Sequence, residues 1–131
     1  MVIDSSALIA LLLGEENALS MARAIAADPK RLLSSFSQLE AAIVIEAKKG
    51  EAGGRELDLL LHQIQATVVP LDSQQTEMAR EAWRLYGKGR HPAGLNIGDC
   101  CSYALSRVSG EALLFKGDDF SKTDIIPVVL S

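Results

Sequence analysis

The sequence predicts an α/β domain in which a central, mostly parallel sheet is flanked by helices. Short apolar runs alternate along the chain with longer segments of helical period, as in parallel sheets whose strands are joined by helices. The 131 residues are 48% hydrophobic, which is enough to bury one core. Because no repeat and no Pro- or Gly-rich linker divides the chain, we expect a single domain over residues 1–131.

The first elements are expected to follow one another closely. Residues 1–4 form a short apolar run that suits a strand, and residues 6–14 turn directly into a helix. Gly14 can end that helix. Residues 18–28 have a second helical period, which ends at Asp28 because a residue before proline disfavours the α region.

The middle of the chain repeats this alternation. Residues 31–35 read as a short strand, and residues 36–50 have a helical period that ends in Lys48, Lys49 and Gly50. Residues 53–66 form another helix. Residues 67–71 suit a strand at the sheet edge, because proline, here Pro70, cannot donate to a strand ladder.

The last part contains two further helices and two further strands. Residues 73–89 are amphipathic, and residues 96–110 form a helix with Asn96 at its N-cap. Two apolar runs, residues 111–115 and 126–130, are expected to be the final strands.

Charge and cysteine content limit the function classes. A net charge of −4 and a pI near 5.1 argue against nucleic-acid binding by bulk attraction, so such a role needs a local basic patch or a bound cation. Cys100 and Cys101 are sequence neighbours and read as buried thiols of a reducing compartment. The apolar N-terminal run carries Asp4 and is closed early by acids. We therefore expect a cytoplasmic protein without a membrane segment.

Four acids fall where ligands of an open α/β sheet bind, at the carboxyl ends of the strands. Asp4 and Asp118 follow apolar strands, whereas Glu40 and Asp99 lie in the first turns of helices. Each also has a structural interpretation. Asp4 could cap a helix, Glu40 could belong to a Ser37–Glu40 capping box, and Asp99 could complement a helix dipole.

The helix before Glu40 could also start earlier, with a Ser35–Gln38 capping box that leaves Glu40 for a site. Carboxylates that converge on one rim repel each other, and a hard divalent cation such as Mg²⁺ or Mn²⁺ would neutralise them. Such a site would activate a water for attack on a phosphodiester.

Four segments carry a family resemblance: "MVIDSSALIALL", "SQLEAAIVIEAKKG", "GRHPAGLNIGDCCSYALS" and "LLFKGDDFSKTDI". In this order they resemble the motifs of PIN-domain ribonucleases, specifically the VapC-type toxins of toxin-antitoxin pairs. The resemblance implies a PIN-like three-layer fold and an endoribonuclease that depends on Mg²⁺, or Mn²⁺. It implies that the catalytic and metal-binding residues are Asp4, Glu40, Asp99 and Asp118.

Asp119 is the alternative to Asp118, because relatives differ in which acid before the Phe completes the cluster. The resemblance further implies that Asp124 holds the loop rather than the metal. The hydroxyl of Ser6 could orient Asp4 or a metal-bound water and so contribute to substrate binding, or Ser6 could simply belong to the first turn of its helix.

The expected partners are an RNA substrate, a cognate antitoxin protein and a second copy of the chain in a homodimer. Lys88 and Arg90 could contact RNA phosphates, although the basic residues before them are interspersed with acids as on a solvated helix face. Two other functions stay open. One is a non-catalytic α/β module that binds a partner, and the other is an aspartyl phosphotransfer enzyme, which would lack the usual second Asp at Ser6.

Overall fold

Four short parallel strands form the sheet at the centre of the molecule, in the order β3-β2-β1-β4. The computed structural model describes all residues, 1–131. The strands are β1 (Val2–Ile3), β2 (Leu32–Ser34), β3 (Thr67–Val69) and β4 (Leu113–Leu114). Val2 stands opposite both Leu32 and Leu113, so β1 lies inside the sheet. The expected α/β fold with a parallel sheet is confirmed, and β3 lies at the edge as Pro70 predicted.

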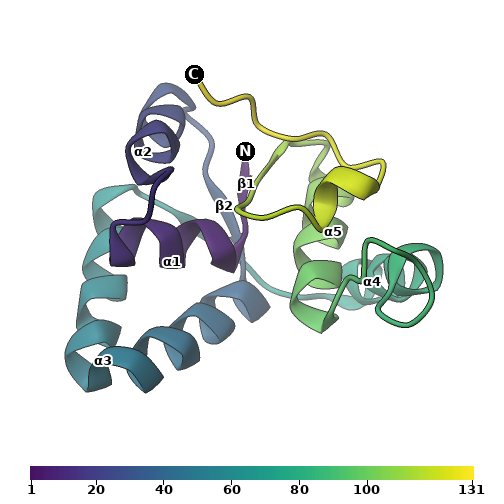
Figure 1. Cartoon of the computed structure of the whole chain (residues 1–131), viewed down its shortest axis with the longest axis horizontal. Helices are drawn as coiled ribbons and strands as arrows, with labels where there is room; N and C mark the ends of the chain where they lie inside the picture. The colour runs from purple at the N-terminus through teal and green to yellow at the C-terminus, as the bar shows by residue number, and fades with distance from the viewer.

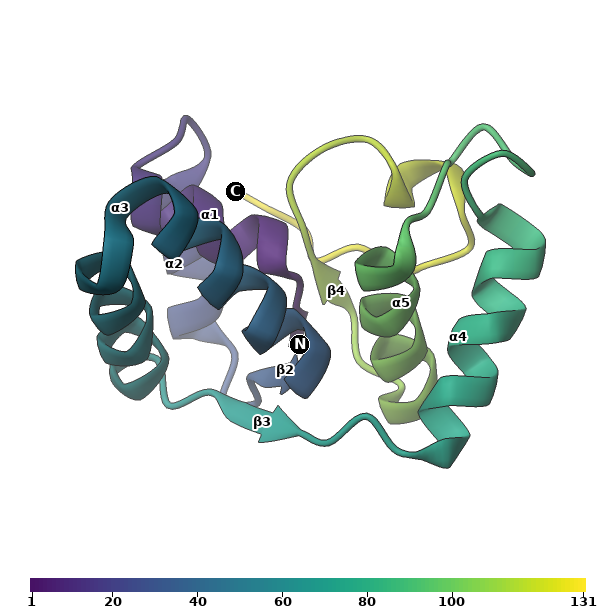
Figure 2. The same cartoon turned by 90° about the horizontal axis from the view of Figure 1, so that it is seen from below.

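Helices cover both faces of the sheet (Figures 1 and 2). The helices are α1 (Ser5–Leu13), α2 (Ala18–Ala27), α3 (Ser35–Gln63), α4 (Ser73–Tyr86) and α5 (Ile97–Ser109), with a short 3₁₀ turn η1 (Phe120–Lys122). Figure 2 places α1 to α3 on one side and α4 with α5 on the other. None of these helices is both long enough and apolar enough to pass through a membrane.

The alternation of side chains along β1 gives each helical layer its own core. Ile3 points into a cluster with Leu8 of α1 and Ile45 of α3. Val2 points into the other cluster, with Tyr103 of α5 and with Leu95, which precedes that helix. Because side chains of a strand alternate between faces, a two-residue strand can anchor both layers.

Helix ends follow the sequence signals closely. Gly14 ends α1 with φ 62°, and Asn96 caps α5 with a full capping box. The two helices expected over residues 36–50 and 53–66 form one element, α3, which bends sharply at Gly50 with φ 67° and ψ −163°. That conformation is essentially restricted to glycine, which is why the break falls there.

Two expectations were wrong. Residues 126–130 do not form a strand: only a single parallel bridge joins Pro127 to Leu113, flanked by two backbone hydrogen bonds. Neither capping box proposed for α3 exists, because the N-cap is Ser34, whose hydroxyl accepts from the Phe36 N–H at 3.2 Å. Ser35 and Ser37 therefore serve other contacts.

Candidate functional site

Asp4 is placed by the strand that precedes it and the helix that follows it. It comes directly after β1 and is the N-cap of α1, where its Oδ2 accepts from the Ser6 N–H at 3.0 Å. Its Oδ1 accepts from the Ser102 hydroxyl at 2.5 Å. The carboxylate is buried, and no Lys, Arg or His forms an ion pair with it. Hydroxyl and amide donors alone therefore support a buried acid.

Glu40 lies one turn into α3 and faces α5. Its Oε1 accepts from the Ser5 hydroxyl at 2.6 Å. A Cβ added to Gly98 would lie 2.7 Å from its Cδ, so the carboxyl group packs against the bare backbone of α5. Burial and the charge of Asp4 raise the pKa of Glu40, although the Ser5 hydrogen bond opposes them.

Asp99 forms the capping box of α5 with Asn96. The Asp99 N–H donates to Asn96 Oδ1 at 2.8 Å, and the Asn96 N–H donates to Asp99 Oδ2 at 3.1 Å. Burial raises the pKa of Asp99 to about 7, with further contributions from the charges of Asp4, Asp119 and Glu40. Four carboxylates from four parts of the chain are thus electrostatically coupled.

The loop after β4 brings in the fourth of these acids. Ser6 Oγ accepts from the Lys116 N–H at 3.0 Å, and the Lys116 side chain pairs with Glu15, so the start of the loop is held against α1. Asp118 and Asp119 are both exposed. Asp119, and not Asp118, is among the acids whose charge raises the pKa of Asp99.

Asp124 lies apart from the other acids and fastens the end of this loop to α5. Its Oδ1 accepts from the Tyr103 hydroxyl at 2.7 Å, and its Oδ2 accepts from Arg107 at 3.1 Å. Both of its oxygens are therefore engaged in holding the loop, the role expected for it.

The residues suit a hard divalent cation by the chemistry of their side chains, although they do not form a preorganised coordination site. All the donors are carboxylate or hydroxyl oxygens, the ligands that Mg²⁺ and Mn²⁺ prefer, and the two cysteines are buried free thiols. No three His, Cys, Asp or Glu side chains are grouped closely enough to hold an ion as they lie. Burial and, to a smaller extent, the charges of the other acids make an ionised Asp99 unfavourable, and a bound cation would offset both.

Helix capping alone does not account for the arrangement. Asp4 and Asp99 do cap helices, as the non-catalytic interpretation expects. A cap, however, needs only its own backbone donors. Neither cap requires Glu40 to be half-buried against α5 or Asp119 to act on Asp99, and both are found.

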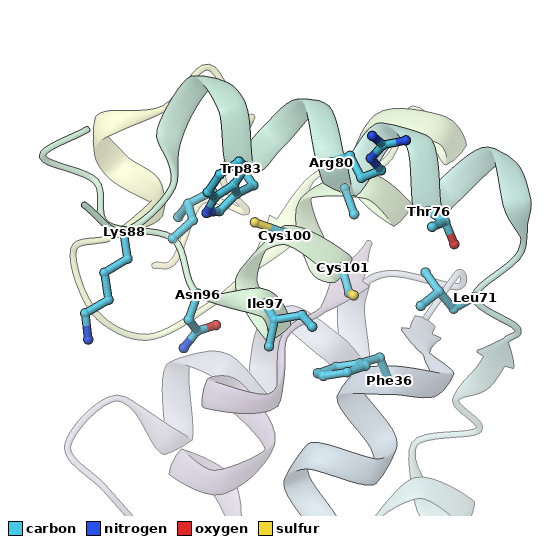
Figure 3. A pocket seen from close by; sticks show the side chains of 12 residues that line it. Phe36, Leu71, Thr76, Arg80, Trp83, Lys88, Asn96, Ile97, Cys100 and Cys101 are labelled. Atoms are coloured by element: carbon cyan, nitrogen blue, oxygen red, sulfur yellow. The ribbon is translucent and has the colours of Figure 1, made fainter. Parts of the chain in front are cut away.

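A largely apolar groove of about 480 Å³ is lined in part by Asn96, Ile97, Cys100 and Cys101 at the N-terminal end of α5. Figure 3 shows it between α4 and the N-terminal turns of α3 and α5, with Phe36, Leu71, Trp83 and Ile97 among its lining. Ile97 is 70% exposed and Trp83 is 47% exposed. The groove thus leaves large apolar side chains uncovered, and no acid is among the residues that line it.

The basic residues expected to contact RNA are near this groove. Lys88 lines it, and the Arg90 guanidinium stacks over the Trp83 ring at 4.6 Å from the ring centre. Arg80 and Arg84 pair with Glu77 and Glu81, as on an ordinary solvated helix face.

Three residues beside the acids were given no role in the sequence analysis, namely Ser5, Gly98 and Ser102, and Ser37 was considered only as a helix cap. Ser102 stands three residues after Asp99 and Ser37 three residues before Glu40, so each lies within a turn of an acid on its own helix. That spacing is the signal that could have found them.

Comparison with known proteins defines the class to which this fold and acidic site belong. The PIN domain family model matches residues 1–126. The chain therefore belongs to the PIN-domain family, and within it to the VapC ribonucleases. It is 56% identical to a ribonuclease VapC of Mycolicibacterium smegmatis, over 98% of this chain and 99% of that one. It is 55% identical to ribonuclease VapC30 of Mycobacterium tuberculosis, over 99% of both chains.

Solved structures agree on the fold. VapC20 of Mycobacterium tuberculosis, described as a toxin that cleaves the sarcin-ricin loop, superposes with a TM-score of 0.79 over 99% of this chain and 98% of that one, at 19% identity. VapBC2 of Rickettsia felis, solved with a promoter DNA fragment, superposes with a TM-score of 0.75 over 96% and 94% of the two chains, at 12% identity. The PIN-like three-layer fold is thereby confirmed.

Proposed function

We propose that the chain is a divalent-metal-dependent endoribonuclease that acts as the toxin of a toxin-antitoxin pair. The observation that carries this proposal is the convergence of Asp4, Glu40 and Asp119 on Asp99, whose pKa is raised to about 7 chiefly by burial and further by the charges of these three acids. The names of the relatives, ribonucleases of the VapC kind, support the substrate class.

Asp4 and Asp99 would hold the cation, with Asp119 and Glu40 beside them. A bound Mg²⁺ or Mn²⁺ would supply Lewis-acid chemistry, polarising the phosphate and favouring deprotonation of a water. Asp4 would contribute a fixed carboxylate, because both of its oxygens already have donors. Glu40 Oε2, which accepts no hydrogen bond within the chain, would orient the attacking water and accept its proton.

Asp119 replaces Asp118 as our choice for the fourth acid. Asp118 lies one residue nearer the strand end and was preferred on that ground. Its carbonyl accepts from the N–H and the hydroxyl of Ser121, so its backbone serves the turn into η1, whereas the charge of Asp119 reaches Asp99.

The test is cleavage of small structured RNAs with Mg²⁺ or Mn²⁺, compared with excess EDTA. Asp99→Asn and Asp119→Asn are expected to lower the cleavage rate by about 100-fold or more, since charge stabilisation of this kind is typically worth 10²–10³. Asp118→Asn is the matched control, one residue away in the same exposed loop, and should retain activity within a few fold. Specific cleavage by Asp99→Asn, or in EDTA, would contradict the proposal.

We also propose that a cognate antitoxin docks beside the acids. Leu39 and Ile43 are 59% and 61% exposed and lie one turn apart on α3, on either side of Glu40 in sequence. An apolar helix face could cover them while a basic side chain enters the carboxylate cluster. A toxin-antitoxin complex from Klebsiella pneumoniae among the structural neighbours, with a TM-score of 0.71, supports an antitoxin as the partner.

A homodimer would cover the groove between α4 and α5. Its exposed apolar lining suits a protein surface, and its basic rim, Lys88 and Arg90, would flank the acids for RNA phosphates, with Ser6 close to Asp4. The two buried free thiols support a cytoplasmic location, where they would stay reduced.

A further inference from the structure

Asp4 is held by a chain of two buried serine hydroxyls. The Ser102 Oγ lies 2.5 Å from Asp4 Oδ1, and the Ser37 Oγ lies 3.1 Å from the Ser102 Oγ. Ser37 and Ser102 are both 0% exposed, and they come from two different helices, α3 and α5. The hydrogen bond between Ser37 and Ser102 therefore crosses the interface between these two helices, beneath the carboxylates.

The direction of the protons follows from the chemistry of serine. A hydroxyl has one proton to donate, and Ser102 directs it to the Asp4 carboxylate, which can only accept. Ser37 must then be the donor in its contact with Ser102. Each bond polarises the next toward the acid, and in a buried setting such chains strengthen one another.

We propose that Ser102 is a positioning residue for metal binding, and that Ser37 acts through it. With Oδ2 fixed by the Ser6 N–H and Oδ1 by Ser102, the Asp4 carboxyl plane has one orientation toward the cluster. Without the Ser102 hydroxyl, Oδ1 would lose its only hydrogen bond, and the carboxyl plane could rotate away from the cation. The role assigned to Ser102 rests on the proposed function, since it requires that Asp4 binds a metal.

The primary experiment is calorimetric titration of Mn²⁺ into the metal-free protein without RNA. Ser102→Ala should weaken Mn²⁺ binding by about 10-fold or more, because partners that orient a metal-binding side chain typically contribute 10–100-fold. Ser102→Cys, which is nearly the same size but a weak donor, should weaken it in the same direction. Ser102→Cys also keeps the test available if the alanine variant folds poorly.

Ser106→Ala is the matched control, because Ser106 is also buried in α5, one turn further on. Its hydroxyl donates to the Glu111 carbonyl at 2.6 Å, away from the acids. The Ser106 variant loses a comparable buried hydrogen bond and should lower the melting temperature without changing Mn²⁺ affinity. Equal losses of Mn²⁺ affinity in the Ser102 and Ser106 variants would reduce Ser102 to a purely structural role and overturn the proposal.

A double-mutant comparison tests whether Ser37 acts on Asp4 only through Ser102. Ser37→Ala alone should weaken Mn²⁺ binding by a smaller factor than Ser102→Ala. In the Ser102→Ala background it should cost nothing further, because Ser37 acts only through Ser102. Additive effects would overturn that order.

RNA cleavage distinguishes a failure of the role assigned to Ser102 from a failure of the proposed ribonuclease function. Ser102→Ala should raise the Mn²⁺ concentration needed for half-maximal cleavage and recover most of kcat at saturating Mn²⁺. If the wild type cleaves and binds Mn²⁺ while Ser102→Ala and Ser102→Cys bind it equally well, the role of Ser102 is wrong and the proposed function stands. If the wild type binds no Mn²⁺, both are wrong.

Discussion

Asp99 performs two tasks with one carboxylate. It closes the capping box of α5 through Asn96, and it is coupled to three other acids. The capping box fixes the side chain in place, whereas burial, together with the charges of the three acids, makes its charge unfavourable in the metal-free protein. A residue held where its charge is disfavoured is typical of functional sites.

The raised pKa of Asp99 predicts a pH dependence of stability. In the folded, metal-free protein its pKa is about 7, against an ordinary value of 3.8, so between these pH values the folded state binds a proton that the unfolded state does not. This stabilisation is present below about pH 4 and is lost as the pH rises through 7. The melting temperature of the wild type in EDTA should therefore fall between pH 5 and pH 8.

Asp99→Asn removes this titration while its amide oxygen can still accept from the Asn96 N–H. The melting temperature of this variant should fall less over the same range, with a residual slope from Glu40, whose pKa is also raised. Thermal denaturation of both proteins at several pH values measures the difference. Parallel curves for the two proteins would contradict the assigned cause.

At the residue scale, sequence reasoning reached the acids but not their supports. Asp4, Glu40, Asp99 and Asp119 were all named, because acids at strand and helix ends are visible in the sequence. The preference for Asp118 over Asp119 rested on distance from the strand, but the turn into η1 decides which acid reaches Asp99. That turn depends on contacts that cannot be predicted from the local sequence pattern.

At the element scale, α5 organises the site. Within its first two turns Gly98 makes room for Glu40, Asp99 joins the coupled acids and Ser102 donates to Asp4. One helix therefore sets the positions of acids from β1 and α3. The boundaries of α5 were predictable from Asn96 and Gly110, whereas its contacts needed the sheet order to be known.

Gly98→Ala should separate activity from stability. The added Cβ would lie 2.7 Å from the Glu40 Cδ, so the flexible carboxyl group must move, which breaks its bond to Ser5. Because alanine is favoured over glycine in helices by up to about 1 kcal/mol, the free energy of unfolding should change little or rise. RNA cleavage should nevertheless fall by about 10-fold or more.

Gly54→Ala in α3 is its control. The added Cβ there would lie 2.9 Å from the Cδ of Glu46, an exposed side chain outside the site. This variant should match the stability change of Gly98→Ala and keep full cleavage activity. Equal activity in the two variants would show that Glu40 does not need its position beside α5.

Other elements show which structural features could be predicted from sequence patterns and which could not. The helix ends at Gly14 and Gly110 were readable because a residue at positive φ leaves a local signature. The helix end expected at Gly50 was readable as well, because the helical backbone breaks at that residue, with φ 67°, and a second helix follows within α3. Residues 126–130 have the composition of a strand, but only the Ile126 carbonyl and the Val128 N–H bond to Leu113, and the pairing beside β4 does not continue.

At the scale of the whole molecule, the parallel sheet explains why distant acids meet. The alternation of strands and helices predicted a parallel sheet, and parallel strands bring their carboxyl ends to one edge. The order β3-β2-β1-β4 could not be read from the sequence. It places β1 beside β4, and thereby brings Asp4 and the loop of Asp119 to the same edge.

The same assembly leaves the apolar groove between α4 and α5 uncovered by the single chain. The groove between α4 and α5 is lined by Trp83, Leu71 and Phe36, and Ile97 projects beside it at 70% exposure. We expect the wild type to sediment as a dimer, and Ile97→Asp to shift it to monomer, because a buried unpaired carboxylate opposes association. An acid at the first position of α5 complements the helix dipole, so the monomer should stay folded.

Leu19→Asp on α2 is the control, since Leu19 is 64% exposed but lies in the other helical layer, and it should leave the dimer intact. Sedimentation velocity across a concentration series measures all three proteins. A monomeric wild type, or dissociation by Leu19→Asp alone, would move the interface away from this groove.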